Sequence, residues 1–178
     1  MDKIGQRVSS VKRKRIISVW ICMLLVLNVV CLTGCGAGKK WKDGKCTISI
    51  ECSSILDNME ALKETKKEFV PSDGWILKET EVSFKGGETA FDVLKQICGK
   101  KGIHMASRYT PLYKSYYVEG INQLYEFDCG KNSGWMYSVN GEYPNYGASS
   151  YNLKDGDKVE WRYTCNLGSD VGDKYEGK

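Results

Sequence analysis

The sequence lacks the residue patterns that most enzymes and metal-binding proteins require. It contains one histidine, His104, and no Cys-x-x-Cys pair, so it lacks the ligand pattern of a tetrahedral zinc site. Gly-x-Ser-x-Gly, His-Glu-x-x-His and a Gly-rich phosphate loop are also absent. A nucleophilic pair of Cys98 and His104 is disfavoured, because Cys98 ends an amphipathic helical segment, where a thiol is usually buried. We therefore expect no enzymatic activity, no metal and no cofactor.

A hydrophobic run long enough for a membrane span is missing near the N-terminus. The uncharged apolar stretch Ile16–Val30 has 15 residues, the length of a signal-peptide core, whereas a spanning helix needs about 20. Six basic residues and one acid precede it, and Leu32-Thr-Gly-Cys35, which resembles the cleavage site of bacterial lipoproteins, follows it. We predict a lipoprotein signal peptide over residues 1–34 and lipidation of Cys35, which would anchor the protein to the extracytoplasmic face of the cell membrane. The alternative is an uncleaved signal anchor.

An excess of basic charge is also lacking once this signal peptide is removed. The full chain has a net charge of +4, but 6 of its 26 bases and 1 of its 22 acids lie in residues 1–34, so the remainder is close to −1. No basic cluster remains to neutralise phosphates, and we do not expect nucleic acid as a partner. We predict a lipidated cysteine and short tether over residues 35–45, one folded domain over 46–168 and a flexible tail over 169–178.

The cysteines that remain after Cys35 are odd in number. They are Cys46, Cys52, Cys98, Cys129 and Cys165. At most two disulfides can therefore form within one molecule, and at least one thiol stays free or pairs between molecules. Outside the cytoplasm we expect at least one disulfide, and the alternative is five small buried thiols.

The pattern of apolar residues predicts an α+β domain in which one main helix packs on a mixed sheet. Alternation predicts strands over 46–52, 75–77, 80–84, 135–139 and 158–165, and in the last of these Val159, Trp161 and Tyr163 share one face. Residues 104–109 are weakly strand-like, and residues 54–67 suggest a short helix or helical loop. The main helix begins after Thr89, with Asp92 in the capping-box position, and Gly99 and Gly102 end it. Asn140-Gly141 predicts a tight hairpin turn. Residues 113–127 are aromatic and irregular.

Three stretches of this sequence resemble a known bacterial family. They are residues 87–94, residues 117–129, and residues 134–163 with their Gly-Trp-Met-Tyr-Ser-Val-Asn-Gly and Leu-Lys-Asp-Gly-Asp-Lys-Val-Glu segments. Together they resemble the transcobalamin-like C-terminal domain family (domain of unknown function 4430), which is similar to the small β domain of transcobalamin and intrinsic factor. The resemblance implies a β-grasp-like sheet in which strands 46–52 and 158–165 are parallel neighbours.

The resemblance also implies a disulfide and a binding region. If the strands that end near Cys52 and Cys165 are neighbours, these two thiols are expected to form a disulfide. The family often has Cys at the position of Ala148, so Cys129 lacks a partner there. In the animal relatives the hairpin and following loop, here residues 135–151, face cobalamin. The cobalamin of those relatives lies between two domains, and this sequence contains only the small one.

The aromatic residues of this hairpin and loop are therefore candidates for ligand or partner binding. They are Trp135, Tyr137, Tyr143, Tyr146 and Tyr151, and we add Asn145 from the same loop. Their rings could stack on a corrinoid, another flat small molecule or a glycan. Trp135 and Tyr137 could instead pack inward as core residues. The alternative function is a protein–protein or adhesive module that binds a partner at the cell envelope.

Overall fold

Residues 41–173 are described by the computed structural model of the protein. The predicted signal peptide, Cys35 and most of the tether lie outside the described residues, as do positions 174–178 of the predicted tail. Within residues 41–173, no helix has the length and apolar character needed to cross a membrane.

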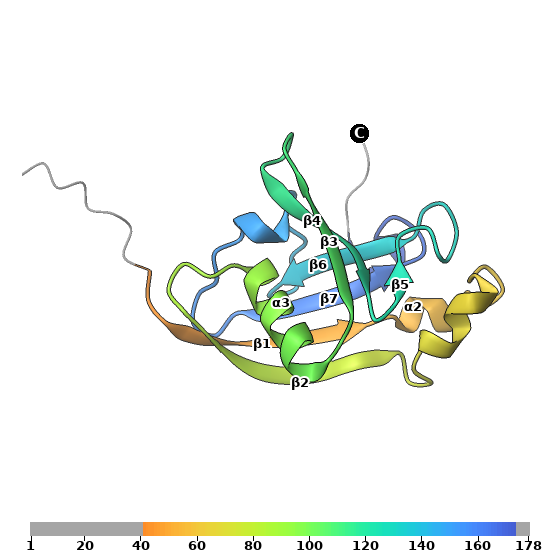
Figure 1. The fold of residues 1–178 in the computed structure, drawn as a ribbon, viewed down its shortest axis with the longest axis horizontal. Coiled ribbons are helices and arrows are strands. Elements are labelled where there is room, and N and C mark those ends of the chain that lie inside the picture. Colours follow the sequence, from red (N-terminus) through yellow and green to blue (C-terminus); the bar gives the residue numbers. More distant parts are fainter. Residues whose placement is uncertain (1–40, 174–178) are drawn as a thin grey trace, which may run out of the picture. The chain divides into compact units, whose positions relative to one another are not determined.

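A four-stranded mixed sheet forms one layer of the domain (Figure 1). Its strands are β1 (Gly44–Glu51), β2 (Trp75–Phe84), β6 (Gly134–Val139) and β7 (Lys158–Thr164). The order is β2-β1-β7-β6, with β1 and β7 parallel at the centre and the two outer pairs antiparallel. The expected mixed sheet and its central parallel pair are confirmed.

β2 is one ten-residue strand where two short strands were predicted. Its pairing with β1 shifts register, because Ile48 pairs with Thr80 while Ile50 pairs with Leu77. Lys78 and Glu79 therefore lie opposite the single residue Ser49, which is the arrangement of a β-bulge. The bulge interrupts the alternation of apolar residues, and the sequence pattern consequently divides one strand into two.

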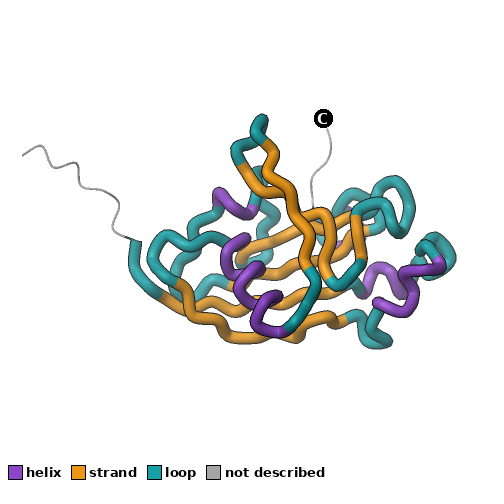
Figure 2. Tube along the Cα trace, in the orientation of Figure 1, coloured by secondary structure: helices purple, strands orange, loops and turns teal. Residues whose placement is uncertain are grey.

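The main helix is α3 (Ala90–Lys101), which lies across one face of this sheet (Figures 1 and 2). The Thr89 hydroxyl accepts a hydrogen bond from the Asp92 backbone N–H at 3.2 Å, and the Asp92 carboxylate accepts one from the Thr89 N–H at 2.9 Å. The helix ends at Gly102, whose φ of 68° is left-handed. The predicted capping box and the stop at Gly102 are confirmed, whereas Gly99, which was also expected to end the helix, lies inside α3.

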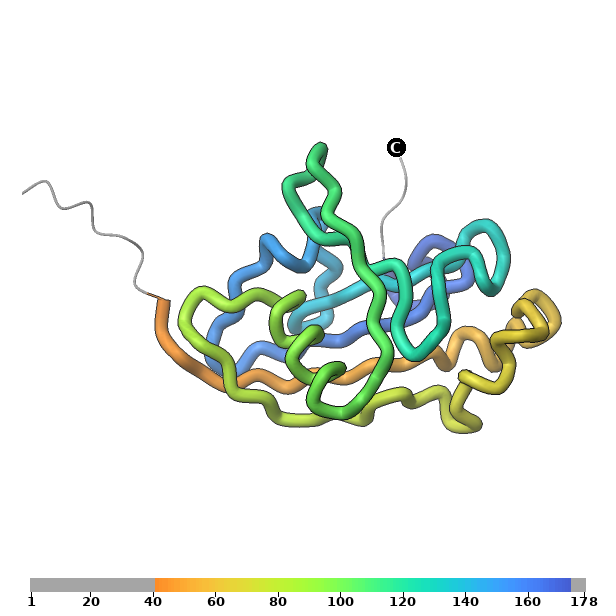
Figure 3. Tube along the Cα trace, in the orientation of Figure 1, coloured from red at the N-terminus to blue at the C-terminus, as the bar shows by residue number. Residues whose placement is uncertain are grey.

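A second sheet lies over the same face, and the sequence predicted only its first strand, from a weak pattern over residues 104–109. It contains β3 (Met105–Thr110), β4 (Ser115–Ile121) and the short β5 (Leu124–Tyr125), all antiparallel. The tip of the β3–β4 hairpin projects beyond the rest of the domain (Figures 1 and 3). Part of the stretch that was predicted to be irregular is thus the strand β4. Aromatic residues lie on both faces of this strand, so its sequence does not alternate between apolar and polar residues.

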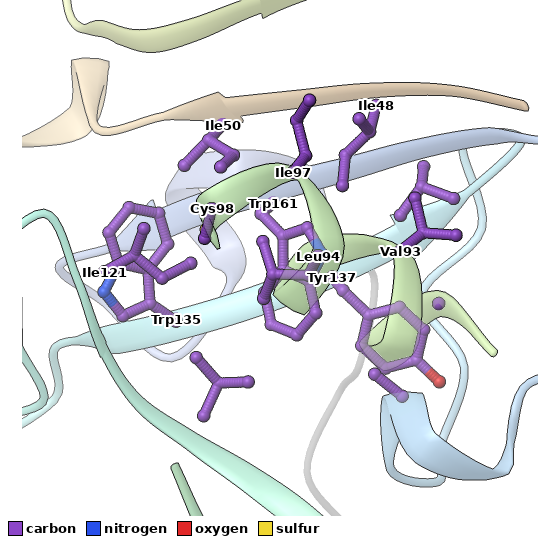
Figure 4. Packing of buried hydrophobic residues seen from close by; sticks show 14 of the residues in the cluster. Ile48, Ile50, Val93, Leu94, Ile97, Cys98, Ile121, Trp135, Tyr137 and Trp161 are labelled. Atoms are coloured by element: carbon purple, nitrogen blue, oxygen red, sulfur yellow. The ribbon is translucent and has the colours of Figure 1, made fainter. Parts of the chain in front are cut away.

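The hydrophobic core fills the space between α3 and the four-stranded sheet (Figure 4). Val159, Trp161 and Tyr163, which share one face of β7, are 0%, 3% and 1% exposed, so this face points into the core. Leu94 of α3 is fully buried, and Cys98 is also in this core, as expected for a structural thiol. Burial of this apolar surface is the main favourable contribution to folding.

Short helices connect the strands at the edges of the domain. They are α2 (Ser53–Leu56) and the 3₁₀ helices η1 (Glu64–Phe69), η2 (Ala148–Ser150) and η3 (Ser169–Val171). η3 falls in the predicted flexible tail, yet Val171 is buried and Asp170 accepts a hydrogen bond from the Cys165 backbone N–H at 2.7 Å. The described part of the tail is therefore packed against the domain, and β1 begins two residues before the predicted domain boundary.

The predicted Cys52–Cys165 disulfide is absent, because all five cysteines among residues 41–173 are free thiols. The parallel register pairs Glu51 with Arg162, so the position opposite Cys52 is Tyr163. Cys165 lies two residues further along, which is roughly 6.6 Å at the rise of a strand. The prediction that β1 and β7 are neighbours was correct, but the register of the two strands places Cys165 two residues beyond the position opposite Cys52.

Candidate functional site

The candidate site is built around the loop that follows β6. Asn140 and Gly141 both have positive φ, 54° and 82°, as the predicted tight hairpin turn requires. The Asn140 side-chain amide donates to Asp157 Oδ1 at 2.9 Å, and its oxygen accepts from the Lys158 backbone N–H at 2.9 Å. The turn is thereby tied to β7, and the chain leaves it at a fixed position.

The same loop is held against β4 by a small cluster of hydroxyl groups. The Ser149 hydroxyl accepts from the Tyr116 backbone N–H at 2.9 Å and lies 2.8 Å from the Ser115 hydroxyl. Gly147 permits this approach, since a Cβ atom at that position would lie 1.8 Å from Ser115 Oγ. The φ of Gly147 is −66°, so space and not backbone conformation requires a glycine here.

Between β4 and this loop lie two adjoining hollows, which together we call the aromatic groove. The inner hollow, about 430 Å³, has a floor from β6 and β7, and the outer hollow, about 550 Å³, extends toward the β3–β4 hairpin. The residues that line both hollows are Tyr116, Tyr117, Pro144, Asn145 and Gly147. Volumes of this size are typical of sites for small molecules.

Two tyrosine rings on opposite walls of the groove are partly open to solvent. Tyr116 is 44% exposed and Tyr146 is 49% exposed. The Tyr116 ring stacks on Phe91 of α3 at 4.8 Å between centroids, and the Tyr146 ring stacks on Tyr151 at 6.3 Å. Each open ring is therefore supported from behind by a second ring, which restricts its motion before a ligand arrives.

Trp135 and Tyr137, two of the predicted site residues, form the floor of the inner hollow as core residues. They are 6% and 9% exposed, and both line that hollow. The Trp135 indole N–H donates to Leu124 O at 2.8 Å, and the Tyr137 hydroxyl donates to Tyr146 O at 2.7 Å. They hold the loop and β5 in place and offer little surface to a ligand. This matches the alternative that both residues pack inward as part of the core.

The remaining predicted residues differ in their exposure. Asn145 and Tyr146 are exposed on the groove wall, whereas Tyr143 is half-buried and its hydroxyl donates to Val171 O at 2.6 Å. Tyr151 is half-buried and supports Tyr146 without lining either hollow. The structure thus gathers the six predicted residues in one region, but Asn145 and Tyr146 are the two best placed to touch a ligand.

The charged side chain at the outer hollow is already paired. The Arg108 guanidinium contacts Glu119 at 3.0 Å and Glu126 at 3.8 Å, and it lies 5.3 Å from the centre of the Tyr117 ring. The Tyr117 hydroxyl donates to Glu126 at 2.7 Å, and burial, together with that carboxylate, raises the pKa of Tyr117 to about 12. Tyr117 is therefore a neutral hydrogen-bonding phenol at physiological pH.

The chemistry that this groove can offer is stacking and hydrogen bonding. Neither hollow is lined by a histidine or cysteine from the described part of the chain, so no imidazole or thiol is present there as nucleophile or general base. Residues 41–173 also contain no group of three or more His, Cys, Asp and Glu side chains that could hold a metal ion.

The wall formed by the β3–β4 hairpin was missed by the sequence analysis. It contributes Arg108, Tyr113, Tyr116 and Tyr117 to the outer hollow. The signal that could have found it is the Tyr116-Tyr117 pair itself. Neighbouring side chains on a strand point to opposite faces, so two adjacent tyrosines place one ring toward the outside whichever face is buried.

Comparison with known proteins supports the fold. Residues 87–165, just under half of the chain, match the model of a family described as Domain of unknown function (DUF4430). These residues run from α3 to the end of β7 and include both walls of the aromatic groove. The resemblance seen in the sequence is confirmed over this range. No curated protein matches the chain.

Two of the solved structures that are similar to the chain illustrate the likeness. Haptocorrin in complex with Cbi is 17% identical with a TM-score of 0.50, and the match covers 77% of this chain and 29% of haptocorrin. A candidate metal-binding protein from Ruminococcus gnavus ATCC 29149 is 14% identical with a TM-score of 0.40, over 68% of this chain and 96% of that protein. The chain thus spans less than a third of haptocorrin, and that similarity supports the fold alone.

Proposed function

With residues 87–165 taken as a transcobalamin-like domain of the DUF4430 family, we propose that the protein is a non-catalytic binding protein whose ligand enters the aromatic groove. One observation carries this proposal. Tyr116 and Tyr146 present open rings on opposite walls, and each is braced by a second ring. Braced aromatic surfaces bind with a smaller loss of side-chain entropy than mobile ones.

The shape and charge of the groove favour a flat ligand with modest charge. The aromatic rings offer faces for stacking, and Asn145 adds an amide that can both donate and accept hydrogen bonds. Arg108 is engaged by Glu119 and Glu126, so it is a poor counter-ion for an anionic ligand. A corrinoid, another planar molecule or a glycan ring fits these properties.

A corrinoid is the first ligand to test. Haptocorrin was solved with Cbi, and its similarity to this chain extends over 77% of the chain. The match covers 29% of haptocorrin, and within residues 41–173 the groove would contact a corrinoid from one side. We expect this contact alone to bind more weakly than a two-sided site, because a smaller part of the ligand surface is buried.

Lipidation at Cys35 would place this groove on the outside of the cell membrane. The Leu32-Thr-Gly-Cys35 segment behind the apolar Ile16–Val30 stretch supports this part of the proposal. Cys35→Ala should abolish both processing after Gly34 and membrane partitioning. Mass spectrometry of the native protein should find an acylated N-terminal cysteine. Cleavage of the variant at that site, with no acyl mass on the native protein, would refute the lipid anchor.

The binding proposal is tested by titrating the full-length protein with cobinamide and cobalamin while tryptophan fluorescence is recorded. Trp135 and Trp161 line the inner hollow, so a bound corrinoid should quench them. Tyr146→Ala should weaken binding by about tenfold, which is the loss of roughly 1.4 kcal/mol expected for a stacking anchor. Phe127→Ala is the matched control, because Phe127 is 56% exposed and lines neither hollow. Equal affinity for both variants would contradict the assignment of the groove.

A second function has its own support at the tip of the β3–β4 hairpin. Leu112 and Tyr113 are 81% and 73% exposed there, next to Tyr109 at 52%. Projecting apolar side chains of this kind suit insertion into a protein partner at the cell envelope. Salt-resistant capture of one envelope protein, lost with Leu112→Ser and unaffected by Phe127→Ala, would favour this module over a small-molecule site.

A further inference from the structure

Two of the free thiols lie together although they are 36 positions apart in the sequence. Cys129 is in the loop between β5 and β6, and Cys165 follows the last residue of β7. Burial raises the pKa of both thiols, and each thiol also shifts the pKa of the other, because the two side chains are neighbours: Cys129 raises the pKa of Cys165, and Cys165 lowers the pKa of Cys129. This pair differs from the Cys52–Cys165 pair that the sequence implied.

Both thiols also rest on the same turn of chain around α2. The Cys129 thiol donates to Asn58 O at 3.5 Å, and the Cys165 thiol donates to the Ser54 hydroxyl at 3.8 Å. Ser54 and Asn58 are themselves joined, since the Asn58 side-chain amide donates to Ser54 O at 2.8 Å. These three hydrogen bonds place both thiols beside the same turn of chain, with Cys129 buried and Cys165 partly exposed.

The backbone on each side of the thiol pair is held in position. The Cys129 N–H donates to the Ser133 hydroxyl at 3.1 Å, and this hydroxyl also accepts from the Tyr163 phenol at 3.0 Å. The Cys165 N–H donates to Asp170 at 2.7 Å. A bond between the two sulfur atoms would thus form without a large movement of either segment, which is the condition that disulfide geometry imposes.

Cys165 is more exposed than the other described cysteines. Cys46, Cys52, Cys98 and Cys129 are each 3% exposed or less and belong to the core, whereas Cys165 is partly exposed. An oxidant in solution therefore reaches Cys165 first. Cys129 is the neighbouring thiol that can complete the reaction.

We propose that Cys129 and Cys165 are a cross-link site, at which a disulfide joins the β5–β6 loop to the end of β7. The oxidant is an external disulfide such as oxidised glutathione. The Cys165 thiolate attacks one of its sulfur atoms and releases the first thiol, and the Cys129 thiolate then attacks the mixed disulfide and releases the second. The two protein thiols lose two protons and two electrons, and the external disulfide becomes two thiols.

The surroundings of Cys165 set the speed of this reaction. Burial raises the pKa of the Cys165 thiol to about 12, with the neighbouring Cys129 thiol as the next contribution. The reactive thiolate is consequently scarce at neutral pH, and we expect the initial oxidation rate to rise about tenfold per pH unit between pH 7 and 9.

Peptide mapping of the full-length protein tests the pairing directly. The protein is equilibrated in oxidised glutathione, free thiols are alkylated, and a tryptic digest is analysed without reduction. The proposal predicts a cross-linked pair of peptides 115–131 and 163–174, which contain Cys129 and Cys165. Recovery of both peptides as separate alkylated species overturns it. So does a link between peptide 163–174 and peptide 46–63, which holds Cys46 and Cys52.

Thermal unfolding gives a second readout that does not depend on mapping. The bond would close a loop of about 37 residues, so the oxidised protein should melt roughly 10 °C above the reduced protein. Cys129→Ser and Cys165→Ser should each remove this dependence on reductant, while both variants melt close to the reduced parent. An equal Tm for oxidised and reduced parent protein contradicts the cross-link.

Discussion

At the scale of single residues, the groove depends on which tyrosines are tied down and which are open. Tyr143 and Tyr146 are near neighbours in one loop, and the sequence analysis predicted both as ligand-binding residues. The structure separates them, because the Tyr143 hydroxyl is bound to Val171 O while the Tyr146 ring is 49% exposed. The first tyrosine supports the loop, and the second is available to a ligand.

We expect this difference to appear in stability. Tyr146→Ala should change the free energy of unfolding by no more than about 0.5 kcal/mol, as is usual for an exposed position. Tyr143→Ala removes half-buried apolar surface and a hydrogen bond, and should cost roughly 2 kcal/mol. Chemical denaturation of the two variants checks the order. Equal losses would mean that Tyr146 is also a structural residue and would remove it from the site.

Gly147 is the residue that lets the loop approach β4. Gly147→Ala places a methyl group against the Ser115 hydroxyl, and we expect a loss of about 1–3 kcal/mol in the free energy of unfolding. Gly99→Ala is the matched control, because nothing lies within 4 Å of its Cβ position and it is inside α3. This control should stabilise the protein by about 0.5–1 kcal/mol. A Gly147→Ala variant as stable as the parent would show that the loop can move away from β4.

The phenol of Tyr117 makes the stability of the folded protein depend on pH in the alkaline range. Its pKa is raised in the folded protein from about 10 to about 12, so the folded state holds its proton more tightly than the unfolded state. The contribution of this proton to stability is complete below pH 10 and is lost as the pH rises toward 12. Tyr117→Phe should flatten this part of the pH–stability curve. An unchanged curve would mean that other phenols account for the whole alkaline loss.

At the scale of elements, sequence reasoning succeeded where a local rule decides the structure. The capping box of Thr89 and Asp92, the turn at Asn140-Gly141 and the shared apolar face of β7 each follow from a few neighbouring residues. It failed where the residues do not alternate cleanly. The bulge in β2 depends on its pairing with β1, and β4 was missed although its partners β3 and β5 are its neighbours in sequence.

The element that controls the candidate site is the β3–β4 hairpin. Its tyrosines supply one wall of the groove, and its tip carries the exposed Leu112 and Tyr113. Half of the site therefore lies on the hairpin whose sequence gave the weakest prediction of secondary structure. The other half, the loop from Tyr143 to Tyr151, was identified from its aromatic composition and from the family resemblance.

At the scale of the whole molecule, the fold class and the central parallel strands could be predicted, because the order of elements and the family resemblance agree. The Cys52–Cys165 pairing was wrong for a reason of register: a two-residue offset between parallel strands is invisible in the sequence. The proximity of Cys129 and Cys165 likewise depends on where the β5–β6 loop meets the end of β7, which no local pattern specifies.

The central claim is that a flat ligand binds in the groove between β4 and the loop after β6. The most direct measurement is a set of two-dimensional amide NMR spectra of the full-length protein recorded during titration with cobinamide. The largest shift changes should fall in residues 108–118 and 143–151, with little change in the exposed edge strand β2 (Trp75–Phe84). Shift changes centred on β2, or none at saturating cobinamide, cobalamin and glycan probes, would contradict this account.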